Sequence, residues 1–146
     1  MKKRTSEKLH RINYLGAEME ALYHQASLRL GISDSAMRAL YTVYDNGGTC
    51  LLSDIYKQSG ISKQTVNSAI RKLESDEILY LEQETGRGKR VYLTDKGKDY
   101  VEKNVARLYA AEIEIFASWS EEEIDSYIRF MEKYNELFRS QLERMQ

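Results

Sequence analysis

The 146-residue sequence has no proline, one cysteine and no long hydrophobic run. A single cysteine excludes an internal disulfide and is typical of proteins kept in a reducing compartment. No apolar run approaches the roughly 18 residues that a membrane-spanning helix needs. The first ten residues, MKKRTSEKLH, are basic but lack the apolar stretch of a signal peptide, so the sequence predicts a cytoplasmic protein without membrane contact.

The residue patterns of common catalytic and metal sites are also missing. The sequence has no G-x-S-x-G stretch, no glycine-rich phosphate loop and no Ser/His/Asp set, which argues against an enzyme. The two histidines, His10 and His24, are too far apart to form an i,i+4 metal pair, and no paired-cysteine spacing occurs. We therefore expect no metal and no cofactor.

The net charge of −1 conceals an uneven distribution of charge along the chain. Residues 85–98 carry five cations and one anion, whereas residues 99–146 carry eleven acidic and six basic side chains. A local basic patch on a nearly neutral chain indicates that a polyanion contacts one region. A solvated loop with an ordinary excess of Lys and Arg is the alternative.

Apolar periodicity predicts helices at both ends of the chain. Residues 9–29 place apolar side chains at steps of three and four, and Gly31 would end that helix. Ser33 is a candidate N-cap for a second helix, which the Asn46-Gly47-Gly48 sequence would end. A long helix is predicted from Thr94 to about Ser118. Its predicted buried face consists of Leu108, Ala111, Ile115 and Trp119.

The last helix and the middle of the chain complete the pattern. Ser120 and Glu123 predict a capping box at the start of the last helix. TCLL reads as a short extended segment, and SDIYKQSG as a short helix stopped by Gly60. LYLEQETGRGKRVYLT reads as two strands joined by a glycine-containing turn.

Residues 53–74 predict a helix-turn-helix, in which two short helices are joined by a turn at Gly60. Val66, Ala69, Ile70 and Leu73 share one face of the second helix and would pack inward. The other face shows short polar groups and cations in place of the Glu–Lys pairs of an ordinary surface helix. Such side chains suit a major groove about 12 Å wide, where Gln and Asn pair with adenine and Arg or Lys contacts guanine or phosphate. The predicted DNA-contacting residues are Ser62, Lys63, Gln64, Thr65, Asn67, Ser68 and Arg71.

The hairpin that follows carries a basic tip, TGRGKR. Glycine lets the backbone approach a ligand closely, and arginine suits a narrow, electronegative minor groove. Arg87, Lys89 and Arg90 are therefore further candidates for contact with DNA. A helix-turn-helix followed by a basic hairpin is a winged helix, and the combination is more specific than either half.

The run LLSDIYKQSGISKQTVNSAIRKLESDEILYLEQETGRGKRVYLTDKG resembles the DNA-binding core of the MarR family of transcriptional regulators. QTVNSAIRKLE and VYLTDKG carry the match, and the flanking helices extend it over nearly the whole chain. The resemblance implies a ligand-responsive repressor that binds a pseudo-palindromic site on double-stranded DNA. It also implies a homodimer in which the N-terminal helix and the last two helices interlock across a twofold axis.

The sequence departs from the family pattern in two places. Many members carry an Asp-x-Arg motif in the wing, where this chain has Thr85-Gly86-Arg87. Arg87 is kept but the aspartate is not, so Glu84 is the candidate substitute. Tyr56 stands where a small residue is usual, which predicts locally different packing between the two helices of the helix-turn-helix.

The expected fold class is mostly α with a small β-hairpin wing. Residues 33–97 would form the winged helix-turn-helix lobe, and residues 1–32 and 98–146 the helical dimerisation region. The apolar faces of the terminal helices support a dimer independently, because monomers avoid large exposed apolar patches. Packing within one chain is the alternative. The alternative function is protein interaction, in which the winged helix binds an acidic protein partner and does not bind DNA specifically.

The eleven tyrosines offer a second candidate site. By resemblance, small aromatic ligands bind in a cleft between the dimerisation helices and the DNA-binding lobe, and tyrosine suits such a cleft because it has an apolar body and a polar tip. The candidate residues are Tyr14, Tyr23, His24, Tyr41, Tyr44 and Tyr109, although tyrosines on helices are more often simply half-buried core residues. Cys50 has apolar neighbours, which predicts a buried, unreactive thiol and not the oxidant sensor of some family members.

Overall fold

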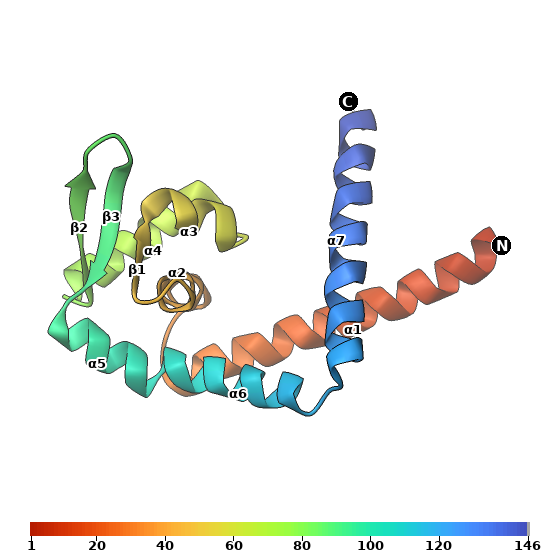
Figure 1. Ribbon diagram of the computed structural model, residues 1–146, viewed down its shortest axis with the longest axis horizontal. Coiled ribbons are helices and arrows are strands. Elements are labelled where there is room, and N and C mark those ends of the chain that lie inside the picture. Colours follow the sequence, from red (N-terminus) through yellow and green to blue (C-terminus); the bar gives the residue numbers. More distant parts are fainter. Residues whose placement is uncertain (146) are drawn as a thin grey trace. The chain divides into compact units, whose positions relative to one another are not determined.

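The computed structural model describes residues 1–145, which form helices and one small sheet (Figure 1). The helices are α1 (Lys2–Leu30), α2 (Asp34–Asp45), α3 (Leu52–Gln58), α4 (Lys63–Ser75), α5 (Asp95–Lys103), α6 (Val105–Ala117) and α7 (Glu121–Arg144). The strands are β1 (Thr49–Leu51), β2 (Leu79–Glu84) and β3 (Gly88–Leu93). The predicted class, mostly helical with a small hairpin wing, is confirmed.

The chain divides into two compact units. The first, Met1–Leu108, contains α1, the lobe of α2–α4 with the sheet, and α5. The second begins at Tyr109 and contains most of α6 and all of α7. Within a single chain α1 therefore belongs to the same unit as the lobe, and the division at residues 33–97 stays a prediction.

The core of the lobe draws one or more side chains from each of its elements. Leu40 of α2, Ile55 of α3, Val66 of α4, Leu79 of β2 and Val91 of β3 are almost completely buried. Burying a side chain of this size contributes about 1.5–3 kcal/mol. The helix-turn-helix and the wing are thus parts of one packed body.

The sheet has the order β1-β3-β2, and both pairs of strands are antiparallel. Cys50 pairs with Val91 across β1 and β3, and Glu84 pairs with Gly88 where β2 and β3 meet the turn. In Figure 1 this turn and the helices α3 and α4 lie on the same, upper side of the lobe, above α2. The hairpin therefore has the position of a wing beside the helix-turn-helix.

The predicted helix ends are largely confirmed. Gly31 adopts a left-handed conformation (φ 67°) after α1, which glycine does without steric cost. The Ser33 side chain accepts a hydrogen bond from the amide of Ala36 at the start of α2. Ser120 and Glu123 form the predicted capping box of α7. The first helix begins at Lys2, seven residues before the periodic segment that predicted it.

The predicted continuous helix from Thr94 to Ser118 is wrong. It is interrupted at Asn104, whose backbone (φ −123°, ψ −72°) is not helical. The Asn104 side-chain amide donates to the Tyr100 carbonyl at 2.8 Å, a local bond of the kind by which asparagine competes with the helical backbone pattern. The result is two helices, α5 and α6, in place of one.

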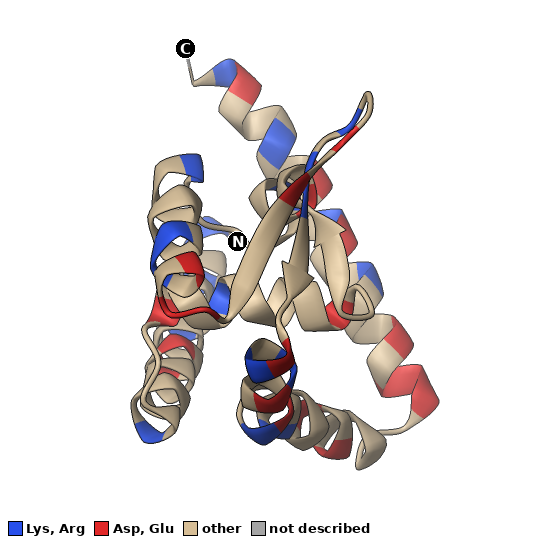
Figure 2. Cartoon of the chain, turned by 90° about the vertical axis from the view of Figure 1, so that its left-hand side faces the viewer, with Lys and Arg blue, Asp and Glu red and all other residues tan. Residues whose placement is uncertain are grey.

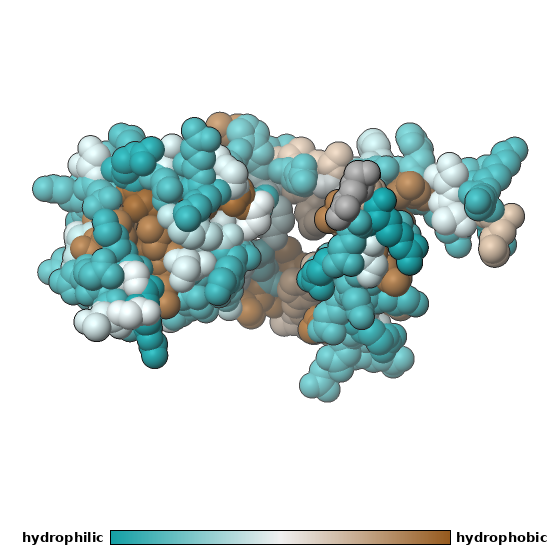
Figure 3. Space-filling model, turned by 90° about the horizontal axis from the view of Figure 1, so that it is seen from above, coloured by the Kyte–Doolittle hydropathy of each residue, from teal (hydrophilic) through white to brown (hydrophobic). Residues whose placement is uncertain are grey.

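The predicted buried stripe of this segment is also not buried in the single chain. Leu108 is half-buried, but Ala111 is exposed, and Ile115 and Trp119 are 55% and 36% exposed. Large apolar side chains are exposed along α1 and α7 as well, and Figure 3 shows hydrophobic residues at the surface of both helical segments. Among them are Ile12, Leu15, Met19, Leu22, Ile128, Met131, Tyr134, Phe138 and Leu142.

The connection from the sheet to α5 is tightly packed. Gly97 of α5 lies against the carbonyl of Ile78, so that a β-carbon at residue 97 would be 1.8 Å from that oxygen. The amide of Thr94 donates to the same carbonyl at 3.1 Å, and the Thr94 hydroxyl donates to the Glu77 carbonyl. This contact fixes the end of the wing against the segment that follows α4.

Candidate nucleic-acid interface

Helix α4 has one buried face and one exposed polar face. Its start is fixed by Ser62, whose hydroxyl oxygen accepts a hydrogen bond from the amide of Thr65 at 3.1 Å. The four residues predicted to pack inward, Val66, Ala69, Ile70 and Leu73, are all buried. Ser62, Lys63, Gln64, Thr65, Ser68 and Arg71 are exposed. The predicted polarity of the helix is therefore present in the folded chain.

Asn67 and Lys63 differ from the other polar residues of α4 because both contact Tyr56 of α3. Asn67 is half-buried, and its Oδ1 accepts a hydrogen bond from the Tyr56 hydroxyl. The Lys63 ammonium lies 5.0 Å from the centroid of the Tyr56 ring, within the range of a cation–π interaction. Tyr56 thus contacts two of the candidate DNA-binding residues, and a difference from the usual packing between the two helices stays a prediction.

Two further contacts hold the turn between α3 and α4. Arg38 of α2 donates from Nη1 to the Ser59 carbonyl at 3.1 Å, and Asn46 donates from its side-chain amide to Gln58 Oε1 at 2.9 Å. The sequence patterns predicted no role for Arg38 or Gln58. No local pattern could have identified them, because each bond joins residues more than ten positions apart.

The three candidate cations of the wing are in different environments. Arg87 and Lys89 are exposed, whereas Arg90 is half-buried and forms an ion pair with Glu84 across the hairpin. The hydrogen bond to Glu84 also raises the pKa of Arg90. Figure 2 shows basic and acidic residues together on the wing. Glu84 therefore pairs mainly with Arg90 and more distantly with Arg87, at 3.7 Å, and its substitution for the aspartate of the family motif stays a prediction.

The candidate ligand residues are spread over several elements. Tyr14 and Tyr23 of α1 are largely exposed, whereas Tyr41 and Tyr44 of α2 pack against the core of the lobe. His24 Nδ1 lies 2.7 Å from Asp34 Oδ2, and this hydrogen bond lowers the pKa of the Asp34 carboxyl. Tyr109 belongs to the second compact unit. Tyr41, Tyr44 and His24 thus have structural contacts within the single chain, and ligand binding by the six residues stays a prediction.

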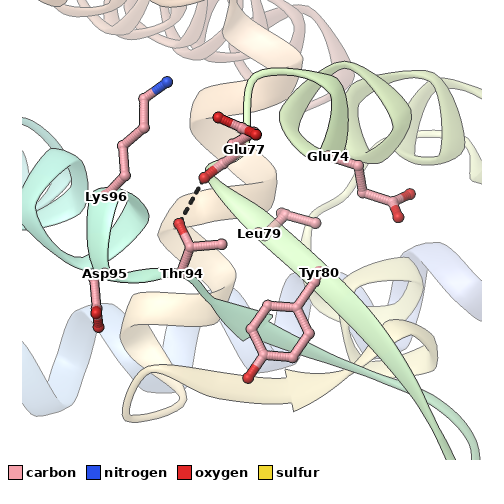
Figure 4. Close-up of a pocket in the computed structure, with 7 residues that line it drawn as sticks. All are labelled: Glu74, Glu77, Leu79, Tyr80, Thr94, Asp95 and Lys96. Atoms are coloured by element: carbon pink, nitrogen blue, oxygen red, sulfur yellow. Dashed lines mark hydrogen bonds between the residues drawn. The ribbon is translucent and has the colours of Figure 1, made fainter.

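A cavity of about 490 Å³ lies elsewhere, where the end of α4 meets the sheet and α5 (Figure 4). It is lined by Glu74, Glu77, Leu79, Tyr80, Thr94, Asp95 and Lys96. Figure 4 shows the carboxylates pointing in different directions, and Asp95 and Lys96 extending to opposite sides. The charged groups do not converge on one point, so the arrangement is not that of a built ion site.

The sulfur of Cys50 is enclosed by the core of the lobe. Cys50 is 2% exposed, and burial raises the pKa of its thiol to about 11. Within residues 1–145, no group of three or more His, Cys, Asp and Glu side chains is placed to hold a metal ion. No helix in this described part combines the length and hydropathy that crossing a bilayer requires.

Comparison with known proteins identifies relatives of this fold. Residues 30–90 match the family model described as MarR family. No curated protein matches the sequence.

Among solved structures, a MarR family regulator from Neisseria meningitidis superposes with a TM-score of 0.83 at 14% identity, covering 95% of this chain and 99% of that one. MepR from S. aureus, solved as a DNA complex, superposes with a TM-score of 0.68 at 22% identity, covering 87% of this chain and 93% of MepR. BpsR from Bordetella bronchiseptica superposes with a TM-score of 0.62 at 22% identity, covering 86% of this chain and 91% of BpsR. Residues 30–90 thus match the MarR family model, and the chain has the winged-helix fold that these MarR family structures share.

Proposed function

We propose that this protein is a DNA-binding transcriptional regulator in which α4 enters the major groove and the wing contacts the adjacent strand. The observation that carries the proposal is the polarity of α4. Four apolar residues anchor one face in the core, while the opposite face exposes Lys63, Gln64, Thr65, Ser68 and Arg71. Two relatives of the fold add support, since MepR was solved bound to DNA and the DNA binding of BpsR is regulated by 6-hydroxynicotinic acid.

Affinity and sequence choice would come from different side chains. Lys63, Arg71, Arg87 and Lys89 would contact phosphates, because a cation at the groove edge gains from releasing counterions. Gln64, Thr65, Asn67 and Ser68 would contact base edges, which carry the sequence information in the major groove. The N-terminus of α4 adds backbone amides for one more phosphate.

We further propose that the protein functions as a homodimer. The exposed apolar residues of α1, α6 and α7 support it, because a lone chain would leave a large apolar surface in water. A twofold dimer places two recognition helices about one DNA turn apart, roughly 34 Å, and so reads a pseudo-palindrome. Binding close to a promoter would then make the protein a repressor, and a small aromatic ligand would release it.

Selection of bound sequences from a pool of random duplexes tests the proposal. We expect a consensus with twofold symmetry, which would establish sequence-specific binding and dimerisation together. The rival is a winged helix that binds an acidic protein partner. A salt titration on random duplex separates the two, since a DNA-binding protein loses affinity steeply as salt rises. Lack of any salt-dependent affinity for DNA would favour the rival.

A further inference from the structure

We propose that Tyr56 is a specificity-determining residue, which acts by fixing the side-chain amide of Asn67 so that the recognition helix reads guanine at one base pair. Tyr56 lies on α3, outside the helix that would contact bases, and it is therefore a positioning residue. The inference rests on the proposed DNA-binding function.

The hydrogen bond between Tyr56 and Asn67 joins two helices of the lobe, α3 and α4. The Tyr56 hydroxyl donates to Asn67 Oδ1 at 2.5 Å, and the Tyr56 ring packs against the hydrophobic core of the lobe. Because Asn67 is half-buried on α4, its amide cannot rotate freely while this bond is held. A side chain held in one rotamer by packing and a supporting hydrogen bond presents a fixed pattern of donors and acceptors.

The hydrogen bond decides which part of the amide faces outward. An unrestrained asparagine pairs bidentately with adenine, accepting from N6–H with Oδ1 and donating from Nδ2 to N7. In this chain Oδ1 is directed to the Tyr56 hydroxyl. The Nδ2 donor is then the group turned toward a base, and guanine offers the two acceptors, O6 and N7, that suit a donor.

Tyr56 also contacts Lys63, which lies one turn before Asn67 on the same side of α4. This contact uses the ring and not the hydroxyl. The two effects of Tyr56 can therefore be separated, since Tyr56→Phe removes the bond to Asn67 and keeps the ring beneath the Lys63 ammonium.

The test compares wild type and Tyr56→Phe by selection from random duplexes, followed by affinity measurements on the selected site. We expect the variant to shift its preference from guanine to adenine at one base pair of each half-site. The relative affinity for the two bases should change by roughly five- to a hundredfold, the range of one good base contact. The salt dependence should stay the same, because no phosphate contact is altered.

Two more variants complete the design. Asn67→Ala should lose preference at the same base pair, and adding Tyr56→Phe to it should change nothing further. Tyr80→Phe removes a hydroxyl from β2 of the same lobe and should keep the wild-type consensus. The inference is overturned if Tyr56→Phe retains the wild-type base preference, or if Tyr56→Phe and Asn67→Ala alter different positions. A wild-type chain that selects no consensus would instead refute the proposed function, and the inference with it.

Discussion

Arg90 Nε lies 2.5 Å from Glu84 Oε2, across the two strands of the wing. Arg87 Nη1 is 3.7 Å from the other oxygen of the same carboxylate, Oε1. The Arg90 side chain is 23% exposed and that of Arg87 is 65% exposed. The two arginines are thus not equivalent, since one is held inside the hairpin by its ion pair and the other extends into solvent.

This difference predicts separate roles in DNA binding. Arg87→Gln should weaken binding to all duplexes and lower the slope of log affinity against log salt by about one, the contribution of one phosphate contact. The double variant Glu84→Gln/Arg90→Gln removes the ion pair without changing the net charge and should leave that slope unchanged. A titration of fluorescent duplex at several salt concentrations measures both. Equal losses of slope would instead assign a phosphate contact to Arg90.

Gln64 and Lys89 test the division between base and phosphate contacts. Both side chains are exposed, Gln64 on α4 and Lys89 on the wing. Gln64→Ala should relax specificity at one base pair, at a cost of about 1–3 kcal/mol on the selected site. Lys89→Ala should weaken binding to selected and random duplexes alike and lower the salt slope by about one. Identical effects of the two variants on both duplexes would contradict this division.

Gly97 is predicted to be required for stability. A β-carbon would lie 1.8 Å from the Ile78 oxygen and 2.8 Å from its carbonyl carbon, and backbone atoms cannot move aside as a flexible side chain can. Gly97→Ala should lower the free energy of unfolding by about 3 kcal/mol or more, beyond the usual cost of overpacking. Lys98→Ala, at an exposed neighbouring position on α5, should change it by less than about 0.5 kcal/mol. Urea denaturation followed by circular dichroism compares them, and equal stability of both variants would disprove the close contact.

Phe138 tests the proposed dimer. It is 48% exposed in the single chain and stacks on Tyr134 of the same helix at 5.9 Å between ring centroids. A charge buried at an interface without a partner is costly, so Phe138→Glu should weaken self-association by roughly thirtyfold or more. Sedimentation equilibrium should then detect the 17.0 kDa chain at concentrations where wild type has twice that mass. Glu136→Gln, on the same exposed helix, is the control, and an unchanged mass for Phe138→Glu would argue against an interface on this face.

Cys50 is predicted to be unreactive. Its pKa of about 11 lies above the reference value of 9.0 because burial disfavours the thiolate. At pH 8 this shift lowers the thiolate fraction by about a hundredfold relative to a thiol with the reference pKa, and burial slows access further. Iodoacetamide labelling of the folded protein should therefore be slow, and should become fast in urea. Rapid labelling of the native chain would contradict the burial.

The same shift has a consequence for stability at high pH. The folded-state pKa is raised, so the unfolded chain releases this proton more readily than the folded chain does. The contribution of the thiol to stability is complete below a pH of about 9 and is lost as the pH rises toward 11. Cys50→Ala should remove this part of the pH dependence while lowering stability slightly at neutral pH through the lost volume.

Local patterns determined much of the lobe. The apolar spacing of Val66, Ile70 and Leu73 predicted which face of α4 packs inward, because helical geometry brings residues three and four apart to one side. Ser33 and Ser120 predicted helix starts for a similarly local reason, since a cap bonds to an amide three residues away. Periodicity alone did not reveal the interruption at Asn104, because the apolar spacing continues across it from Val101 to Val105.

The sequence by itself therefore determined that the chain folds as a winged helix with a polar recognition helix, since that information lies in spacings of two to four residues. Only the tertiary structure decided how the polar residues are used. Tyr56 meets Asn67 and Glu84 meets Arg90 because the packing of α3 on α4 and the register of β2 on β3 bring them together. Such pairings depend on where whole elements settle in the core, and no local spacing contains them.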